Sequence, residues 1–152
     1  MKKVLITLDY DPTSQKVAKS GFDMAKTMHA EITLLHVISK PLFYYTQYSG
    51  MYQQLELRDD LKVAAQDFLN KTKKDLGTEG IKILVKEGES AEQILLAAKE
   101  INADIIVLGT HSRKWLENIL MGSVAEEVLK DASIPLFIVP TKKTEKETIG
   151  KK

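Results

Sequence analysis

Apolar and polar positions follow one another in this chain in two patterns, one typical of buried strands and the other of amphipathic helices. Short, mostly apolar runs recur at intervals along the whole sequence, and the run at 105–108 has no polar position. Apolar runs of this length are typical of strands in a parallel sheet that is covered on both faces. We therefore expect strands at residues 4–8, 32–38, 81–85, 105–108 and 134–139.

The segments between these runs have the spacing of helices. Apolar residues return every three or four positions there, so that they share one face of a helix. After the first run this face comprises Val17, Gly21, Met24, Ala25 and Met28. A longer helix ends near Gly77 and has Leu57, Leu61, Ala64, Ala65, Phe68, Leu69 and Leu76 on one face, and a short helix after the third run has Ile94, Leu95, Ala98 and Ile101.

Local signals predict where three of the helices begin. A side-chain oxygen before the first turn can accept from an unpaired backbone N–H, and proline is tolerated at the first helical position. A serine followed three residues later by Glu or Gln forms a capping box. The signals are Asp11 with Pro12, Ser90 with Gln93, and Ser123 with Glu126.

Strands that alternate with helices predict an α/β fold. Five such strands, joined by helical crossovers, indicate a doubly wound, Rossmann-like parallel sheet with helices on both faces. Ligands of such sheets bind beyond the carboxyl ends of the strands, where the winding direction reverses. We therefore look for the functional site in the segments that follow the strands.

Composition agrees with one globular domain. The chain has 152 residues, of which 43% are hydrophobic and 28% charged, enough to bury a sizeable core. A net charge of +1 gives no reason to expect nucleic-acid or membrane binding through bulk electrostatics. The absence of cysteine excludes disulfides and thiol chemistry, and the first apolar run is too short for a signal sequence. We expect a cytoplasmic protein.

Residues 103–140 carry the strongest chemical signal. A buried strand stops at Gly109, a polar loop follows, and a helix begins near Gly122 and Ser123. A helix start offers unpaired N–H groups to an anion, and glycine lets the backbone approach it closely. Thr110, Ser112 and Arg113 are further donors. The alternative reading is that Gly109 only ends a strand, Gly122 only spaces a helix start and the hydroxyls are caps.

The spacing of Gly109, Ser112 and Gly122 with Ser123 resembles the nucleotide-binding signature of the universal stress protein family. The resemblance extends from the strand before Asp9, through the runs at 34–38 and 85–95, to the last strand. It implies one domain over residues 1–140, with strand order 3-2-1-4-5 as in adenine nucleotide alpha hydrolase-like folds. Residues 141–152 are lysine-rich and read as a flexible tail.

The resemblance also implies where a nucleotide would bind. An acidic residue at the position of Asp9 lies beside the adenosine in the family, although Asp9 could also be a loop carboxylate or a helix cap. Leu8 and the backbone of Val37 would hold the base and ribose. The expected phosphate end of the site comprises Leu108, Gly109, Ser112, Gly122, Ser123 and Val124, with His111 and Arg113 as nearby donors of undefined role.

The expected ligand is ATP, AMP or ADP, with Mg²⁺ beside the phosphates. Ser112 departs from the family pattern, which has glycine there; its Cβ could crowd a phosphate, or its hydroxyl could donate to one. Neither a GxxxxGK[ST] loop nor GxGxxG after the first strand is present, which speaks against P-loop hydrolases and dinucleotide dehydrogenases. The third strand lacks the phosphoacceptor aspartate of a response regulator. No catalytic residues and no metal ligands are predicted.

Two functional classes remain. The first is an ATP-binding stress-response dimer that acts as a nucleotide-dependent switch, with slow hydrolysis at most. The second is a dimeric interaction protein that does not bind nucleotide. In both, family members commonly pair through the last strand, here residues 134–139. Aromatic residues in the segment 43–52 could pack over the sheet, form a lid or contact a protein partner.

Overall fold

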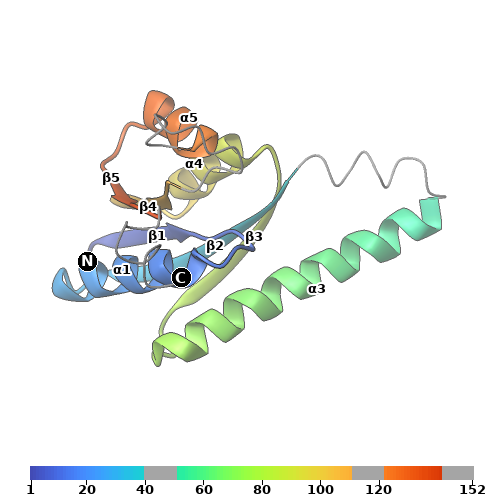
Figure 1. Cartoon of the computed structure of the whole chain (residues 1–152), viewed down its shortest axis with the longest axis horizontal. Helices are drawn as coiled ribbons and strands as arrows, with labels where there is room; N and C mark the ends of the chain where they lie inside the picture. Colours follow the sequence, from blue (N-terminus) through green and yellow to red (C-terminus); the bar gives the residue numbers. More distant parts are fainter. Residues whose placement is uncertain (40–50, 111–121, 142–152) are drawn as a thin grey trace, which may run out of the picture.

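The computed structural model of the chain describes residues 1–39, 51–110 and 122–141. The His111, Ser112 and Arg113 predictions, the segment 43–50 and the tail from 142 lie outside these residues. Figure 1 shows the arrangement of the helices and strands. In chain order they are β1 (Lys3–Thr7), α1 (Ser14–Thr27), β2 (Glu31–Ser39), α3 (Met51–Leu76), β3 (Lys82–Gly88), α4 (Ser90–Glu100), β4 (Ile105–Gly109), α5 (Ser123–Asp131) and β5 (Leu136–Val139).

The strands form one sheet in the order β3-β2-β1-β4-β5, and every neighbouring pair is parallel. Helices α1 and α3 cover one face of this sheet, and α4 and α5 cover the other (Figure 1). The doubly wound fold and the strand order 3-2-1-4-5 are thus confirmed. Because β1 has β2 on one side and β4 on the other, the winding direction reverses at the carboxyl end of β1.

Alternating residues of the strands build two hydrophobic cores, one on each face of the sheet. Ile6 and Leu34 point to the α1 and α3 side, and both are fully buried there with Leu69 of α3. Leu5 and Ile106 point to the opposite side and pack with α4 and α5. Burial of central strands on both faces explains why their sequences are continuous apolar runs.

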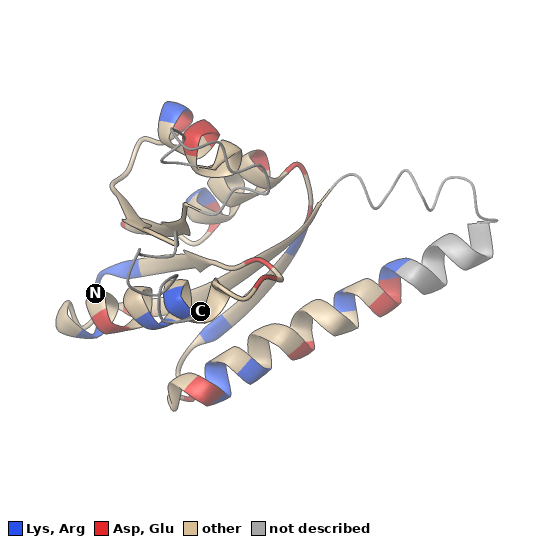
Figure 2. Cartoon of the chain, viewed as in Figure 1, with Lys and Arg blue, Asp and Glu red and all other residues tan. Residues whose placement is uncertain are grey.

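Helix α3 is long and only partly covered. Ala65, Leu69 and Thr72 are buried against the sheet, whereas Ala64, which the sequence placed on the same face, is exposed. The ion pair of Arg58 with Glu87 of β3, at 2.9 Å, ties the helix to the sheet edge. Charges of both signs are distributed along α3 (Figure 2). Within the described residues, no helix combines the length and the apolar composition needed to cross a membrane.

The capping predictions for α4 and α5 are wrong by one residue. The N-cap of α4 is Glu89, whose carboxylate accepts from the N–H groups of Ala91 at 3.3 Å and Glu92 at 2.8 Å. Ser90, the expected cap, is already helical. A carboxylate can accept from two amides and carries the negative charge that a helix start favours. Glu89 therefore has the capping role that the sequence pattern assigned to Ser90.

Helix α5 differs because its N-cap is Gly122, which has no side chain to donate or accept. Ser123 is the first helical residue, so the predicted capping box with Glu126 is not formed. Helix α1 likewise begins later than the Asp11 signal suggests, at Ser14, with Thr13 as N-cap. Asp11 instead accepts from the backbone N–H and the hydroxyl of Thr13.

Replacing Glu89 by alanine should lower the free energy of unfolding by about 0.5–2 kcal/mol, the range for losing an N-cap. Ser90→Ala is the matched control and should have little effect, because the Ser90 side chain does not cap the helix. Urea titration followed by circular dichroism measures both. Equal losses in the two variants would contradict the assignment of the cap to Glu89.

Strand β5 is shorter than expected, Leu136–Val139 in place of 134–139. Pro135 lacks an N–H, so pairing from the β5 side can begin only after it. Its carbonyl nevertheless accepts from Ile106 N at 3.1 Å, which aligns β5 with β4. Short edge strands with proline at their start are typical of sheet edges.

Candidate functional site

Those predicted site residues that the structure describes lie at the carboxyl edge of the sheet, where β1 and β4 end side by side. The pairing of the two strands runs from Val4↔Ile105 to Ile6↔Val107. The hydroxyl of Thr7 also donates to the carbonyl of Val107 at 3.0 Å. Asp9, two residues further along, is exposed at this edge. Residues 100 positions apart in sequence are therefore brought to one place by the strand order.

On the other side of β1, the pairing with β2 ends close to Leu8 and Val37. The register stops at Thr7↔Leu35, and the last backbone bond runs from Leu8 N–H to the Leu35 carbonyl at 2.9 Å. Beyond it the buried ring of His36 contacts the carbonyl of Leu8 through Nδ1 at 2.7 Å. Leu8 and Val37 are both buried, 3% and 8% exposed, so only their backbone is in position to meet a ligand.

At the end of β4, the small size of Gly109 serves packing. A Cβ there would lie 2.8 Å from Cγ2 of Val17 in α1 and 3.1 Å from Cγ2 of Thr141. The next residue, Thr110, is buried, and its N–H donates to the Val139 carbonyl at 3.1 Å. Leu108, 3% exposed, belongs to the core of the α4 and α5 face. Gly109 thus lets α1 and the chain after β5 approach the site.

Thr110 was a candidate ligand donor, but its hydroxyl already has partners within the protein. Its Oγ1 accepts from the N–H of Thr141 at 3.0 Å and lies 3.2 Å from the hydroxyl of the same residue. Both threonines are buried. Their side chains therefore join the ends of β4 and β5, and the structure gives Thr110 a structural role.

The third part of the site is the N-terminus of α5. Gly122 is buried, Ser123 is exposed, and Val124 packs partly into the core. The first backbone bond of the helix runs from Glu126 N–H to the Gly122 carbonyl at 3.0 Å. In any helix the N–H groups before that bond have no partner inside the helix. Here no side-chain bond caps them within the described residues.

An aromatic cluster that sequence reasoning did not find lies beside Asp9. The ring centroids of Tyr10 and His36 are 4.2 Å apart, and Phe68 of α3 lies 4.9 Å from Tyr10 and 5.8 Å from His36. Partial burial, followed by the nearby charge of Asp67, raises the pKa of the Tyr10 hydroxyl. The position of Tyr10 next to Asp9 was visible in the sequence, but its contact with α3 depends on the tertiary fold.

Of the other two histidines, His111 lies outside the described residues, and His29 lies apart from this site. His29 follows the C-cap of α1 with a φ of 53°, and its N–H donates to the Lys26 carbonyl at 3.1 Å. Asn102 follows the C-cap of α4 in the same left-handed conformation, with a φ of 56°. Among the described residues, no group of three or more His, Cys, Asp or Glu side chains is placed to hold a metal ion.

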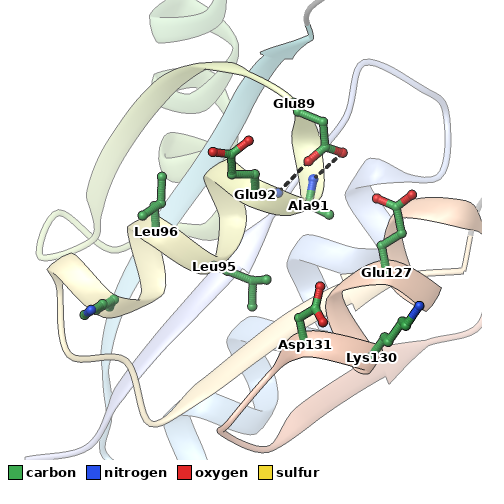
Figure 3. Close-up of a pocket in the computed structure, with 9 residues that line it drawn as sticks. Glu89, Ala91, Glu92, Leu95, Leu96, Glu127, Lys130 and Asp131 are labelled. Atoms are coloured by element: carbon green, nitrogen blue, oxygen red, sulfur yellow. Dashed lines mark hydrogen bonds between the residues drawn. The ribbon is translucent and has the colours of Figure 1, made fainter.

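A separate cavity of about 530 Å³ lies between α4 and α5. Figure 3 shows Leu95 and Leu96 on its α4 side, with Glu127 and Asp131 on α5. The carboxylate of Glu89 is turned back toward its own helix (Figure 3). None of the predicted site residues that the structure describes lines this cavity. Its charged lining comprises the acidic Glu89, Glu92, Glu127 and Asp131 and the basic Lys99 and Lys130, an acidic excess that does not suit a phosphate.

Comparisons with known proteins agree with this fold. The model of the universal stress protein family matches residues 1–140. The chain is 36% identical over 148 residues to universal stress protein MJ0531 of Methanocaldococcus jannaschii, covering 96% of this chain and 85% of that protein.

Solved structures share the fold. Hypothetical protein MJ0577, which is universal stress protein MJ0577 of the same organism, superposes with a TM-score of 0.78 at 29% identity over 94% of this chain and 98% of that one. A universal stress protein in complex with cAMP has a TM-score of 0.62 at 18% identity, over 93% and 98% of the two chains. The latter shares the fold alone.

Proposed function

Because the chain belongs to the universal stress protein family, we propose that it binds an adenine nucleotide where β1, β4 and α5 meet and that it acts as a nucleotide-dependent switch. The fold itself can accept such a ligand, since one protein that shares it is a universal stress protein in complex with cAMP. ATP, ADP and AMP are the candidate ligands, and the cytoplasm is the proposed location.

The contrast between α4 and α5 carries this proposal. Both helices begin at the carboxyl edge of the sheet, on the same face. The amides of α4 are occupied by the carboxylate of Glu89, an anion supplied by the protein itself. The amides of α5 follow a glycine, and no side chain of the described residues caps them. An unsatisfied helix N-terminus favours an anion from outside, and a nucleotide phosphate fits this requirement.

The base and ribose would lie at the other side of β1. Asp9 is exposed there, and the backbone of Val37 faces the end of the β1–β2 pairing. Mg²⁺ would be held mainly by phosphate oxygens and water, as is usual for this ion. In such an arrangement the protein supplies binding and positioning, so slow hydrolysis at most is expected.

Titration calorimetry of the purified protein with ATP, with and without Mg²⁺, tests the proposal. We expect micromolar binding of ATP, weaker binding of adenosine, and loss of ATP binding in Gly122→Val, whose side chain would obstruct the α5 amides. Mass spectrometry of the purified protein should detect any nucleotide retained from the cell. No retained nucleotide and no binding at millimolar ATP would favour the alternative, a dimeric interaction protein.

We further propose that two copies pair through β5, because the two edges of the sheet differ. Strand β3 carries charged residues, which form ion pairs such as Lys86 with Glu100 at 2.7 Å, and β5 carries none (Figure 2). Charged edges resist pairing with another sheet, whereas apolar edges favour it. Phe137 of β5 is 36% exposed. An antiparallel β5–β5 contact about a two-fold axis would cover it.

Light scattering should therefore give about twice the 17.1 kDa mass of one chain for the wild-type protein. Phe137→Lys should shift the protein toward the monomer, because it places a charge at the centre of the contact. Leu96→Lys, an exposed leucine on α4, is the control and should leave the mass unchanged. A monomeric wild-type protein would contradict the proposed dimer.

A further inference from the structure

The backbone ladder between β1 and β2 ends with the bond from Leu8, and the next hydrogen bond that a regular ladder would have is not formed. Leu8 continues the register that ends at Thr7↔Leu35, so it lies opposite His36, and its N–H donates to the Leu35 carbonyl. In a regular parallel ladder, the carbonyl of the same residue accepts from the N–H two positions further along the partner strand. That donor would be Val37. Within the described part of the chain, no backbone bond joins Val37 to Leu8.

The missing bond coincides with a side-chain bond. The carbonyl of Leu8 lies 2.7 Å from Nδ1 of His36. A carbonyl oxygen can only accept, so Nδ1 must carry the proton and donate it. The His36 side chain points to the α1 and α3 face, where it contacts Phe68. This bond therefore draws the Leu8 carbonyl out of the sheet plane, away from the N–H of Val37.

The ring of His36 is held in this orientation by its neighbours. It is 5% exposed, and its centroid lies 4.2 Å from that of Tyr10 and 5.8 Å from that of Phe68, so the three rings pack against one another. Tyr10 is 54% exposed, so it forms the solvent-facing part of this cluster. A buried, well-packed donor keeps a fixed geometry better than an exposed one, because water does not compete for the bond.

The backbone of Val37 points into the site. Successive residues of a strand direct their N–H and C=O groups to opposite sides, so Val37 faces the same side as Leu35, whose carbonyl bonds to β1. Strand β1 ends at Thr7, so no strand residue of β1 lies opposite Val37. The N–H and C=O of Val37 therefore face the edge where Asp9 is exposed.

We propose that His36 is a positioning residue of the site: by holding the Leu8 carbonyl, its Nδ1–H keeps the Val37 N–H available to a ligand acceptor such as an adenine ring nitrogen. His36 does not touch the ligand itself. The identity of this ligand rests on the proposed function, whereas the state of the Val37 amide does not.

Hydrogen exchange at single amides, measured by NMR, tests the first step without ligand or mutation. Val37 lies within β2, two residues before its end, and its amide should nevertheless exchange much faster than that of Leu35, which lies inside the ladder. ATP should then slow exchange at Val37. If the Val37 amide of the ligand-free protein is as protected as that of Leu35, the inference is overturned, whatever the protein binds.

Three variants test the second step. His36→Asn places an amide donor where Nδ1 lies, so it should keep both the fast exchange at Val37 and the wild-type affinity for ATP. His36→Leu keeps the bulk but removes the donor, and His36→Gln places its donor where Nε2 lies. Both should slow exchange at Val37 and weaken ATP binding by about tenfold, as expected for one lost hydrogen bond.

The outcomes separate the two proposals. Equal weakening of ATP binding in the Asn and Leu variants would show that His36 acts only through packing, and would overturn the inference. Fast exchange at Val37 without any ATP binding to the wild-type protein would contradict the proposed nucleotide site but support the role of His36. Thermal unfolding of each variant identifies any that has lost its fold, and the exchange rates of the wild-type protein remain decisive in that case.

Discussion

Ser123→Asp should make the protein more stable and at the same time weaken its binding of ATP. Ser123 is the exposed first residue of α5, and among the described residues no side chain caps the helix start. A carboxylate there interacts favourably with the helix dipole, by about 0.3–1 kcal/mol. The same charge would repel the phosphates at the α5 amides and reduce the affinity by at least about tenfold. Chemical denaturation and calorimetry with ATP measure the two effects.

Ser133→Asp is the control for Ser123→Asp. Ser133 is also exposed and lies beyond the opposite end of α5, at the amino edge of the sheet. The added charge is the same, but it is far from the α5 amides, so ATP affinity should be unchanged. A Ser123→Asp variant that binds ATP as tightly as the wild-type protein would place the phosphates elsewhere. The two effects have opposite directions, since stability should rise while ATP affinity falls. A variant that had merely lost its fold would show a loss of both stability and affinity.

Gly109→Ala should lower the free energy of unfolding by about 1–3 kcal/mol, the usual cost of overpacking. The new Cβ would lie 2.8 Å from Cγ2 of Val17 and 3.1 Å from Cγ2 of Thr141, closer than carbon atoms normally approach. The neighbours must therefore move, and these neighbours connect α1 and β5 to the site. We expect ATP affinity to fall with stability, as measured by urea titration and calorimetry.

Gly80→Ala is the matched control, because no atom lies within 4 Å of the Cβ it would add. Its stability should change by no more than about 0.5 kcal/mol. Adding Val17→Ala to Gly109→Ala removes the nearer contact, and the double variant should be more stable than the sum of the two single effects predicts. Additive effects would show that Gly109 is small for a reason other than this contact.

Helix capping illustrates what local sequence signals could and could not predict. Serines followed by Glu or Gln correctly located the starts of α4 and α5 to within one residue. The capping groups themselves were wrong, since Glu89 caps α4 and Gly122 precedes α5. A capping signal in the sequence locates a helix start to within one or two residues. Which of these residues bonds the first amides depends on the direction in which the chain enters the helix.

Gly109 and Thr110 show the same limit for the candidate site. The sequence predicted that both residues follow a buried strand, and the structure confirms that β4 ends there. The sequence could not predict their contacts, because Val17 precedes Gly109 by 92 positions and Thr141 follows Thr110 by 31. The strand order brings Val17 and Thr141 to the end of β4, and a local sequence pattern cannot predict such a contact. The nucleotide contacts of these residues remain predictions.

The sequence by itself determined the α/β class, the five strands and the segments in which a site could lie. It could do so because burial on both faces of a parallel sheet imposes continuous apolar runs, and helix packing imposes its own spacing. Only the tertiary structure decided that His36 bonds the Leu8 carbonyl and that Tyr10 and Phe68 pack against the ring. These contacts join β1, β2 and α3. They depend on how the three elements pack together, and the periodicity of a single sequence does not contain this information.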